Sequence, residues 1–323
     1  MAMTRGDSSK RTTVITQLRG GLGNQLFQYC AGLNIAQRVD GQPVFEPDPL
    51  GRGEMCSAVG LPIRVSPPTV GERIGEHYGR RADMLRVRNV GHKVMDQMRL
   101  IEFVEQWATP YEPLDTSVQL RGRRTVRLKG RFQDPSWLGR TLDSVVSEVL
   151  EFLDQQPPLT ANGNFMAVSF RRGDYTSLGW SLPLSYYADA LDEIDCGLAC
   201  VVLCDDRDFA MLAANWLTAN GYRAVSASAV GGGTLLGDLT VLTRARAVVM
   251  ANSTFCWWGT VLGDALSPGR RVAFPDPWAH WLPHEDGGRL QRDSWIPIAW
   301  QPRGSEYELT NTGYASGQAW IGS

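Results

Sequence analysis

The stretch TTVITQLRGGLGNQLFQYCAGLNIAQRV (residues 12–39) contains the features that decide the fold. Its first part, TTVITQL, is a run rich in β-branched residues that predicts a strand. Three glycines follow closely, and apolar residues then recur at helical spacing from Leu26 to Ile35. A strand, a glycine turn and a helix in this order are typical of the first unit of a Rossmann-like domain. The sequence therefore predicts an α/β protein.

The glycine turn matches neither of the common phosphate-binding motifs. Leu26 stands where the dinucleotide fingerprint has a third glycine or alanine, and no Lys-Ser/Thr pair follows as in a P-loop. Instead, Asn24 and Gln25 open the helix, and their side-chain amides can both donate and accept hydrogen bonds. The turn therefore suits a polar ligand that carries both kinds of group.

The rest of the chain repeats this alternation. Strand-like and helix-like segments alternate from FMAVSF (165–170) to RVAFP (271–275), which predicts a mostly parallel sheet covered on both faces. Residues 51–120 are irregular and rich in Arg, Gly and Pro, and we place loops and helices there. We predict an N-terminal Rossmann-like domain at 12–154, a linker at 155–164, a C-terminal Rossmann-like domain at 165–300 and a tail at 301–323.

Composition describes an ordinary globular protein. Of the 323 residues, 43% are hydrophobic and 20% are charged, and the formal net charge is -2, without the basic excess of a nucleic-acid binder. The first residues lack the apolar core of a signal peptide, and no later run reaches the roughly 18 apolar residues of a membrane span. We expect a cytoplasmic protein. The six cysteines are scattered without a C-x-x-C pair, and we interpret them as reduced thiols.

Four polar clusters follow predicted strands, at 20–25, 171–174, 205–206 and 252–255. Ligands of open α/β sheets bind beyond the carboxyl ends of the strands. Arg171 and Arg172 offer planar donors that suit a pyrophosphate, although a structural cluster of salt bridges would use the same residues. Asn252, Ser253 and Thr254 can cap a helix or help to bind an anion at its start.

The acidic cluster and the histidines allow several interpretations. Asp205 and Asp206 could accept hydrogen bonds from a ribose or a base, or could cap the next helix. Together with Asp208, the second of them could also form an Asp-x-Asp metal pair. His280 and His284 lie in the tryptophan-rich segment WAHWLPHED, where a loop packed on the core is favoured over a wall that stacks on sugars.

Five segments together resemble one known family. They are RGGLGNQLFQYCAGL, VSFRRGDY, LPLSYYADAL, LCDD and ANSTFCWWGTVLG, and in this order they are similar to the bacterial type of alpha-1,2-fucosyltransferase, an inverting glycosyltransferase. The resemblance implies two Rossmann-like domains that face each other across a cleft, the GT-B architecture. It also implies GDP-fucose as the donor, a galactose-containing acceptor that reacts through a hydroxyl, expected to be O2 of a terminal galactose, and no metal or other cofactor.

The resemblance also implies which residues form the site. The family motif H-x-R-R-x-D falls on residues 169–174, with Ser169 in place of its histidine, so one hydrogen bond to the donor phosphates is expected to be weaker. A histidine restored at 169 is expected to leave the fold intact and to tighten donor binding. The residues implied to bind the donor are Gly21, Gly23, Asn24, Gln25, Ser169, Arg171, Arg172, Asp205, Asp206, Asn252, Ser253, Thr254 and Phe255.

Arg171, Asn24 and Asp174 are the implied catalytic residues. Arg171 would stabilise charge on the departing phosphate, and Asn24 would contact the fucose or the leaving oxygen. A general base would remove the proton of the acceptor hydroxyl. Besides Asp174, the candidates for this base are Glu46 and Asp48. Two alternatives stay open: a metal-dependent glycosyltransferase that uses the Asp-x-Asp pair, and a protein that binds nucleotide sugars with little or no turnover.

Overall fold

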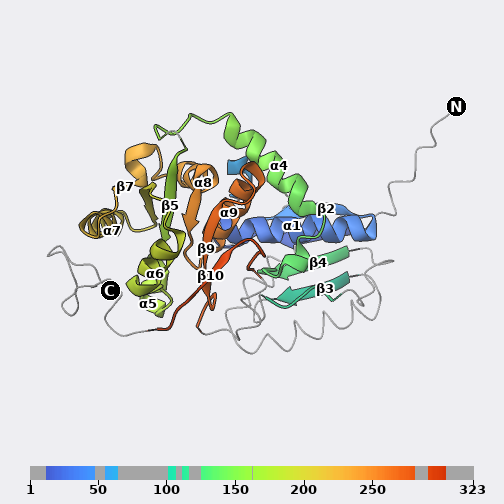
Figure 1. The fold of residues 1–323 in the computed structure, drawn as a ribbon. Helices are drawn as coiled ribbons and strands as arrows, with labels where there is room; N and C mark the ends of the chain where they lie inside the picture. The colour runs from blue at the N-terminus through green and yellow to red at the C-terminus, as the bar shows by residue number, and fades with distance from the viewer. Residues whose placement is uncertain are drawn as a thin grey trace. The chain divides into compact units, whose positions relative to one another are not determined.

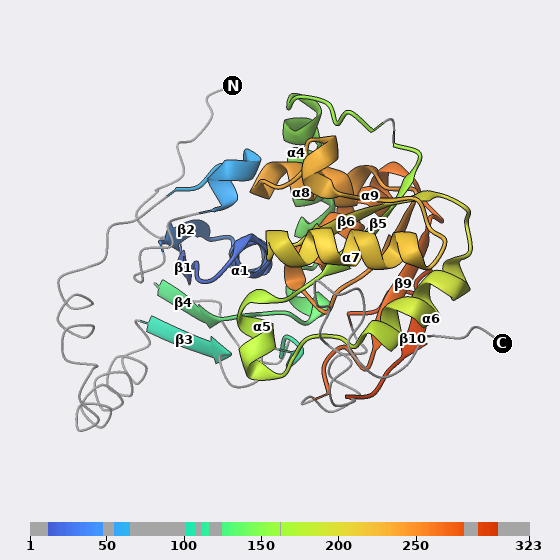
Figure 2. The same cartoon turned by 90° about the vertical axis from the view of Figure 1, so that its left-hand side faces the viewer.

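The computed structural model describes residues 12–47, 55–64, 101–106, 111–115, 125–161, 163–280 and 290–302 (Figures 1 and 2). The chain forms two compact units, residues 1–145 and 146–323, which we call unit 1 and unit 2. The division falls inside helix α4 (Thr141–Asp154), whose last residue forms an ion pair with Arg244 of unit 2. The contacts therefore divide the chain a little before the predicted linker.

Unit 1 contains a four-stranded parallel sheet with the strand order β2-β1-β4-β3. After β1 the chain enters helix α1 (Leu22–Val39), which leads to β2. The strands are β1 (Thr13–Gln17), β2 (Gln42–Glu46), β3 (Ile101–Gln106) and β4 (Thr125–Gly130), and two short 3-10 helices are η2 (Cys56–Val59) and η4 (Pro135–Trp137).

The core of unit 1 fixes the segment that follows β4. Val14 of β1 and Leu128 of β4 pack with Ile35 of α1, and all three are fully buried. Phe132 and Trp137 join this cluster, with their ring centroids 4.7 Å apart. Burial of these large apolar side chains holds residues 132–137 against the sheet and α1.

Unit 2 contains a six-stranded parallel sheet with the order β10-β9-β8-β5-β6-β7. Counted from β5, this order is 6-5-4-1-2-3, the strand order of a Rossmann fold. The strands are β5 (Phe165–Phe170), β6 (Ala199–Cys204), β7 (Ala224–Ser226), β8 (Ala247–Val249), β9 (Arg271–Asp276) and β10 (Ile296–Ala299). The helices are α5 (Gly173–Leu178), α6 (Leu184–Ile194), α7 (Arg207–Ala219), η5 (Ala227–Val230), α8 (Leu235–Arg244) and α9 (Thr254–Leu266).

Strand β5 is covered on both faces, and every one of its residues is buried. Phe170 packs on Tyr187 of α6 and Phe209 of α7, with ring centroids 3.9 and 5.5 Å apart. Ser169 points to the opposite face, where it bonds to Cys256 of α9. Helices α6 and α7 therefore cover one face of the sheet, and α9 covers the other (Figure 1).

The predicted α/β class with two parallel-sheet domains is confirmed. The prediction of loops and helices throughout residues 51–120 was wrong, because β3 lies there. Its sequence, IEFVEQ, lacks the continuous apolar run that marks a buried parallel strand, and β3 is an edge strand paired only with β4. The sequence interpretation also missed β10 and the short helix α5. The predicted tail lies outside the described residues after residue 302.

Three further findings bear on the sequence predictions. None of the described helices combines the length and hydrophobicity that crossing a bilayer requires. All six cysteines lie in the described part of the chain and are free thiols. The ring of His280 packs edge-on against that of the buried Trp300, with centroids 5.9 Å apart, as expected for a loop packed on the core. His284 lies outside the described residues.

Candidate active site

The carboxyl edge of the unit 2 sheet brings three of the four predicted clusters together. β5 lies between β6 and β8 and is parallel to both, so residues 171–174, 205–206 and 252–255 follow neighbouring strand ends. The strand order reverses between β5 and β8, which is where open α/β sheets bind their ligands. This edge of unit 2 is therefore the candidate active site.

Arg171 is held at this edge by two carboxylates. Its Nη2 lies 2.6 Å from Asp174 Oδ1, and its Nη1 lies 2.8 Å from Asp205 Oδ2. The side chain of Asp174 is 62% exposed, and ion pairs this exposed contribute little to stability. An incoming anion can therefore replace Asp174 at the guanidinium, while Asp205 keeps Arg171 in place.

Asp205 also shapes the turn that leads into α5. Its Oδ1 accepts a hydrogen bond from the backbone N–H of Arg172 at 2.8 Å. Gly173 has a φ of +26°, and a Cβ at this position would lie 2.4 Å from Asp205 Oδ2. The Asp205 carboxylate therefore connects the end of β6 to the turn at Arg171 and Arg172. The sequence interpretation considers only a contact with a ribose or a base, or a helix cap.

The second arginine points in a different direction from the first. The guanidinium carbon of Arg172 lies 4.4 Å from the ring centre of Phe209 in α7, whereas that of Arg171 lies 5.1 Å from the ring centre of Tyr175 in α5. Cation–π contacts of this kind orient a guanidinium and leave its edges able to donate hydrogen bonds. The pair thus spreads positive charge along the edge of the sheet.

Asp206 caps a helix. Its Oδ1 accepts a hydrogen bond from the backbone N–H of Phe209 at 3.0 Å, which fixes the start of α7. Asp208 lies in the first turn of the same helix and is exposed. Within the part of the chain that the structure describes, no three His, Cys, Asp or Glu side chains gather as metal ligands would.

The start of α9 forms the other side of the candidate site. Ser253 is the N-cap of this helix, and Thr254 and Phe255 follow it, half-buried. Asn252 is buried and donates from Nδ2 to the Trp180 carbonyl at 3.0 Å, while its Oδ1 has no hydrogen-bond partner among the described residues. The hydroxyl of Tyr175 donates to the Asn252 carbonyl at 3.3 Å. These contacts connect the loop around α5 to the start of α9.

Ser169 lies beneath α9. Its hydroxyl forms a hydrogen bond with the Cys256 thiol, and only 7% of the residue is exposed. Burial raises the pKa of Cys256, and the hydrogen bond from Ser169 opposes this shift only in part. In the structure the Ser169 hydroxyl therefore bonds to Cys256 inside the protein. The sequence instead led us to expect a contact with the donor phosphates.

Replacing Ser169 with His is therefore expected to destabilise the fold, contrary to the expectation from sequence alone. The imidazole would have to occupy the space of Cys256, and such overpacking costs about 1–3 kcal/mol, or a few degrees in melting temperature. Calorimetry should show this fall for Ser169→His and a partial recovery for Ser169→His/Cys256→Ala. A single variant that melts with the wild type would show that the site already has room for a histidine.

In unit 1, the glycine turn follows the end of β1. Gly20 has a φ of +83°, and a Cβ at this position would lie 2.8 Å from Asn24 Nδ2, so the turn needs glycine here for both reasons. Gly21 is the exposed N-cap of α1, and Gly23 is buried in its first turn. The sequence interpretation selected Gly21 and Gly23, but the glycine next to the Asn24 amide is Gly20.

The amide of Gln25 is used inside unit 1. The residue is fully buried, its Nε2 donates to the Gly20 carbonyl at 3.0 Å, and its Oε1 accepts from the backbone N–H of Met55 at 2.7 Å. A donor contact by Gln25 would require these bonds to break. Asn24 is half-buried and is the better placed of the two for a ligand.

Two of the three candidate bases are described, and both are paired with arginines. Glu46 is buried and forms an ion pair with Arg127 of β4. Asp174 pairs with Arg171 but is mostly exposed, as noted above. Asp48 lies outside the described residues. Of the described pair, only Asp174 is accessible enough to receive a proton from a bound hydroxyl.

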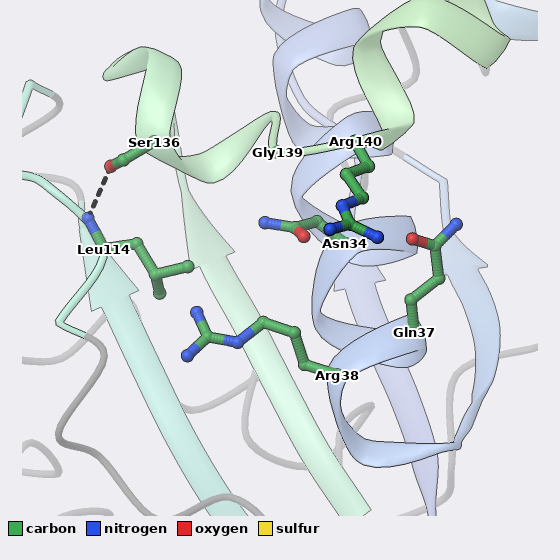
Figure 3. A pocket seen from close by; sticks show the side chains of 7 residues that line it. All are labelled: Asn34, Gln37, Arg38, Leu114, Ser136, Gly139 and Arg140. Atoms are coloured by element: carbon green, nitrogen blue, oxygen red, sulfur yellow. Dashed lines mark hydrogen bonds between the residues drawn. The ribbon is translucent and has the colours of Figure 1, made fainter.

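A pocket of about 390 Å³ in unit 1 lies away from the glycine turn. Figure 3 shows Arg38, from the end of α1, and Arg140, directly before α4, reaching into it. Ten residues of α1 separate Asn24 from Asn34 in the wall of the pocket, a distance of about 15 Å along a helix. The pocket contains none of the predicted site residues; its lining is Asn34, Gln37, Arg38, Leu114, Ser136, Gly139 and Arg140.

Sequence reasoning missed three residues that support the unit 2 edge and the glycine turn of unit 1. Tyr175 and Trp180 connect α5 to α9, and Gln133 donates to Asn24 Oδ1 at 2.7 Å. Their contacts join segments 72 to 109 residues apart. No local pattern signals such a contact, although Gln133 follows the end of β4 by three residues.

Comparison with known proteins gives one family match. Residues 129–267 match the family described as Glycosyl transferase family 11. No curated protein matches the chain in sequence. The matched segment contains all three clusters of the unit 2 edge and Gln133, and it ends at Ser267, directly after α9.

Several solved structures are distantly similar. Fucosyltransferase NodZ from Bradyrhizobium is 13% identical with a TM-score of 0.39, over 78% of this chain and 92% of that one. Arabidopsis thaliana FUT1 is 12% identical with a TM-score of 0.47, over 78% and 68%. The E. coli heptosyltransferase WaaC is 14% identical with a TM-score of 0.43, over 88% and 92%. These likenesses are too distant to transfer any property to this chain.

Proposed function

We propose that the chain transfers L-fucose from GDP-fucose to O2 of a terminal galactose in an oligosaccharide, with inversion, because residues 129–267 match the family described as Glycosyl transferase family 11. The observation that carries this proposal is the position of Arg171 at the reversal point of the unit 2 sheet. Arg171 lies directly before the turn into α5, and its Nη1 pairs with Asp205. Its Nη2 pairs with Asp174, whose side chain is exposed.

The proposed reaction is a single displacement. The acceptor oxygen bonds to the anomeric carbon of fucose as the bond from that carbon to the β-phosphate oxygen breaks, and the electron pair of that bond leaves with GDP. Arg171 stabilises the charge that gathers on the phosphate, and the N–H groups at the start of α9 face the same edge. The bond to the β-phosphate oxygen breaks ahead of the formation of the new bond, so the acceptor hydroxyl becomes acidic only late in the reaction. Asp174 or water then takes its proton.

We predict that GDP-fucose raises the melting temperature of the protein more than UDP-galactose or an ADP-sugar does. A ligand that binds only the folded state stabilises it by about 2.7 kcal/mol at a hundred times its Kd. The same samples, mixed with galactose-ended oligosaccharides, should release GDP and form a fucosylated product. Stronger stabilisation by UDP-galactose would refute the donor assignment. Binding of GDP-fucose without GDP release would instead favour a nucleotide-sugar-binding protein.

We also propose that transfer needs no metal, because two guanidiniums can balance a pyrophosphate charge and Asp206 is occupied as a helix cap. Transfer in EDTA is expected to equal transfer in manganese or magnesium. Loss of activity in EDTA with recovery on adding manganese would favour the alternative that uses Asp206 and Asp208. Thermal stabilisation by GDP-fucose in EDTA serves as the control for donor binding.

A further inference from the structure

In unit 1, β1 and β4 are neighbouring parallel strands, so their carboxyl ends lie side by side. The chain leaves β1 into the glycine turn that carries Asn24, and it leaves β4 into the segment that carries Gln133. The Nε2 of Gln133 donates to Asn24 Oδ1 at 2.7 Å, so one hydrogen bond joins the two strand ends. Ligands of open α/β sheets bind beyond the carboxyl ends of the strands.

The position of Gln133 is fixed on both sides. Phe132 has a φ of +51°, and its buried ring packs on Trp137. Asp134 accepts a hydrogen bond from the backbone N–H of Ser136 at 2.9 Å and caps η4. Gln133 itself is only 3% exposed. Its amide nitrogen is therefore held against Asn24 by a rigid segment.

The amide of Asn24 consequently has a defined direction. Its oxygen faces Gln133, and its nitrogen lies over Gly20, where a Cβ would lie only 2.8 Å away. Rotation of the amide by half a turn would place two N–H groups against each other at the Gln133 contact. Asn24 therefore presents its N–H donors on the side of the glycine turn.

We propose that Gln133 is a positioning residue that fixes this direction, so that Asn24 donates to an oxygen of the donor sugar or of its leaving phosphate. The inference rests on the proposed function and on the expectation from sequence that Asn24 contacts the fucose or the leaving oxygen. The Oε1 of Gln133 is buried with no hydrogen-bond partner among the described residues, and a buried orphan acceptor lowers stability. A purely structural role for this amide is therefore disfavoured.

The first test is Gln133→Leu, which removes the donor and also the orphan acceptor. We expect kcat to fall about three- to tenfold, the reach of one net hydrogen bond, with the melting temperature unchanged or higher. A structural role gives the opposite pattern, a lower melting temperature with unchanged kcat, and would overturn the proposal. Gln133→Glu should lower kcat further, because a carboxylate draws the Asn24 N–H groups toward itself.

The second test is coupling. If Gln133 acts through Asn24, the double variant Asn24→Ala/Gln133→Leu should be no slower than Asn24→Ala alone. If the two substitutions each lower kcat and their effects multiply in the double variant, the proposal is wrong. Asn34 provides a matched control, since its buried amide lies on the same helix and donates to the Trp137 carbonyl at 3.0 Å. Asn34→Ala should lower the melting temperature and leave kcat within twofold.

A third measurement separates this inference from the proposed function. The side-chain amide signals of Asn24 in a ¹⁵N NMR spectrum, assigned by their loss in Asn24→Ala, should move in Gln133→Leu and hardly move in Asn34→Ala. This result is expected whether or not the protein transfers fucose. Unmoved Asn24 signals would overturn the positioning contact, whereas moved signals in a protein without transfer activity would overturn the proposed function alone.

Discussion

Replacing Arg171 with Lys is expected to lower kcat by about 10²–10³ and to change the melting temperature by less than about 2 °C. A loss of that order follows the removal of one preorganised donor to a developing negative charge. Lysine keeps the charge but lacks the planar fork that contacts two oxygens at once. In the structure this fork spans Asp174 on one edge and Asp205 on the other, and an ammonium group can keep only one of these contacts.

The deficit should appear in kcat more than in the KM for GDP-fucose. The phosphate gains charge as the glycosidic bond breaks, and only interactions that strengthen in the transition state accelerate the chemical step. In the proposed ground-state complex, Arg172 and the start of α9 would still face the pyrophosphate. Steady-state kinetics with varied GDP-fucose at saturating acceptor separates the two parameters.

Arg244→Lys is the control for this experiment. Arg244 is an exposed arginine at the end of α8 that pairs with a single carboxylate, that of Asp154. Its replacement should change kcat less than twofold. If Arg171→Lys keeps most of the wild-type activity, or if it unfolds while Arg244→Lys does not, then Arg171 is structural and the proposed mechanism has its central residue wrong.

The sequence predicts unit 2 well because local and long-range signals agree there. Each buried strand is a short apolar run, and each cluster of polar residues follows such a run directly, as Arg171 follows β5 and Asp205 follows β6. In a parallel sheet the ends of neighbouring strands lie side by side, so the order of elements alone indicates that the clusters meet. The edge strand β3 escapes the same reasoning because it carries charged residues and is paired on one side only.

The detailed contacts of the site could not be predicted in the same way. Gln25 looks like a ligand-binding amide in the sequence, but packing buries it and gives both of its polar atoms partners within unit 1. Ser169 looks exposed at the end of a strand, but the alternation along β5 points it beneath α9. Both outcomes depend on which neighbouring element covers a side chain, and that is decided by tertiary packing.

Gly173→Ala is expected to lower kcat by about 10²-fold in a protein that stays folded. The new Cβ would lie 2.4 Å from Asp205 Oδ2, and a carboxylate cannot stay that close. Asp205 would have to leave both Arg171 Nη1, at 2.8 Å, and the backbone N–H of Arg172, at 2.8 Å. Of its two ion pairs, Arg171 would then keep only the one with the exposed Asp174, so the donor to the departing phosphate would be less well preorganised.

Gly179→Ala separates this effect from backbone strain. Gly179 ends the same helix with a φ of +68°, and a Cβ there would meet no other atom within 4 Å. Gly173, with a φ of +26°, instead faces the carboxylate of Asp205. Alanine with a positive φ costs about 1–3 kcal/mol at either end of α5, so both variants should melt a few degrees lower. Only Gly173→Ala should lose activity, and Gly173→Ala/Asp205→Ala should be no slower than Asp205→Ala, because the clash acts through that carboxylate. Equal loss of kcat in the two glycine variants would mean that the path of α5, rather than the position of Asp205, controls Arg171.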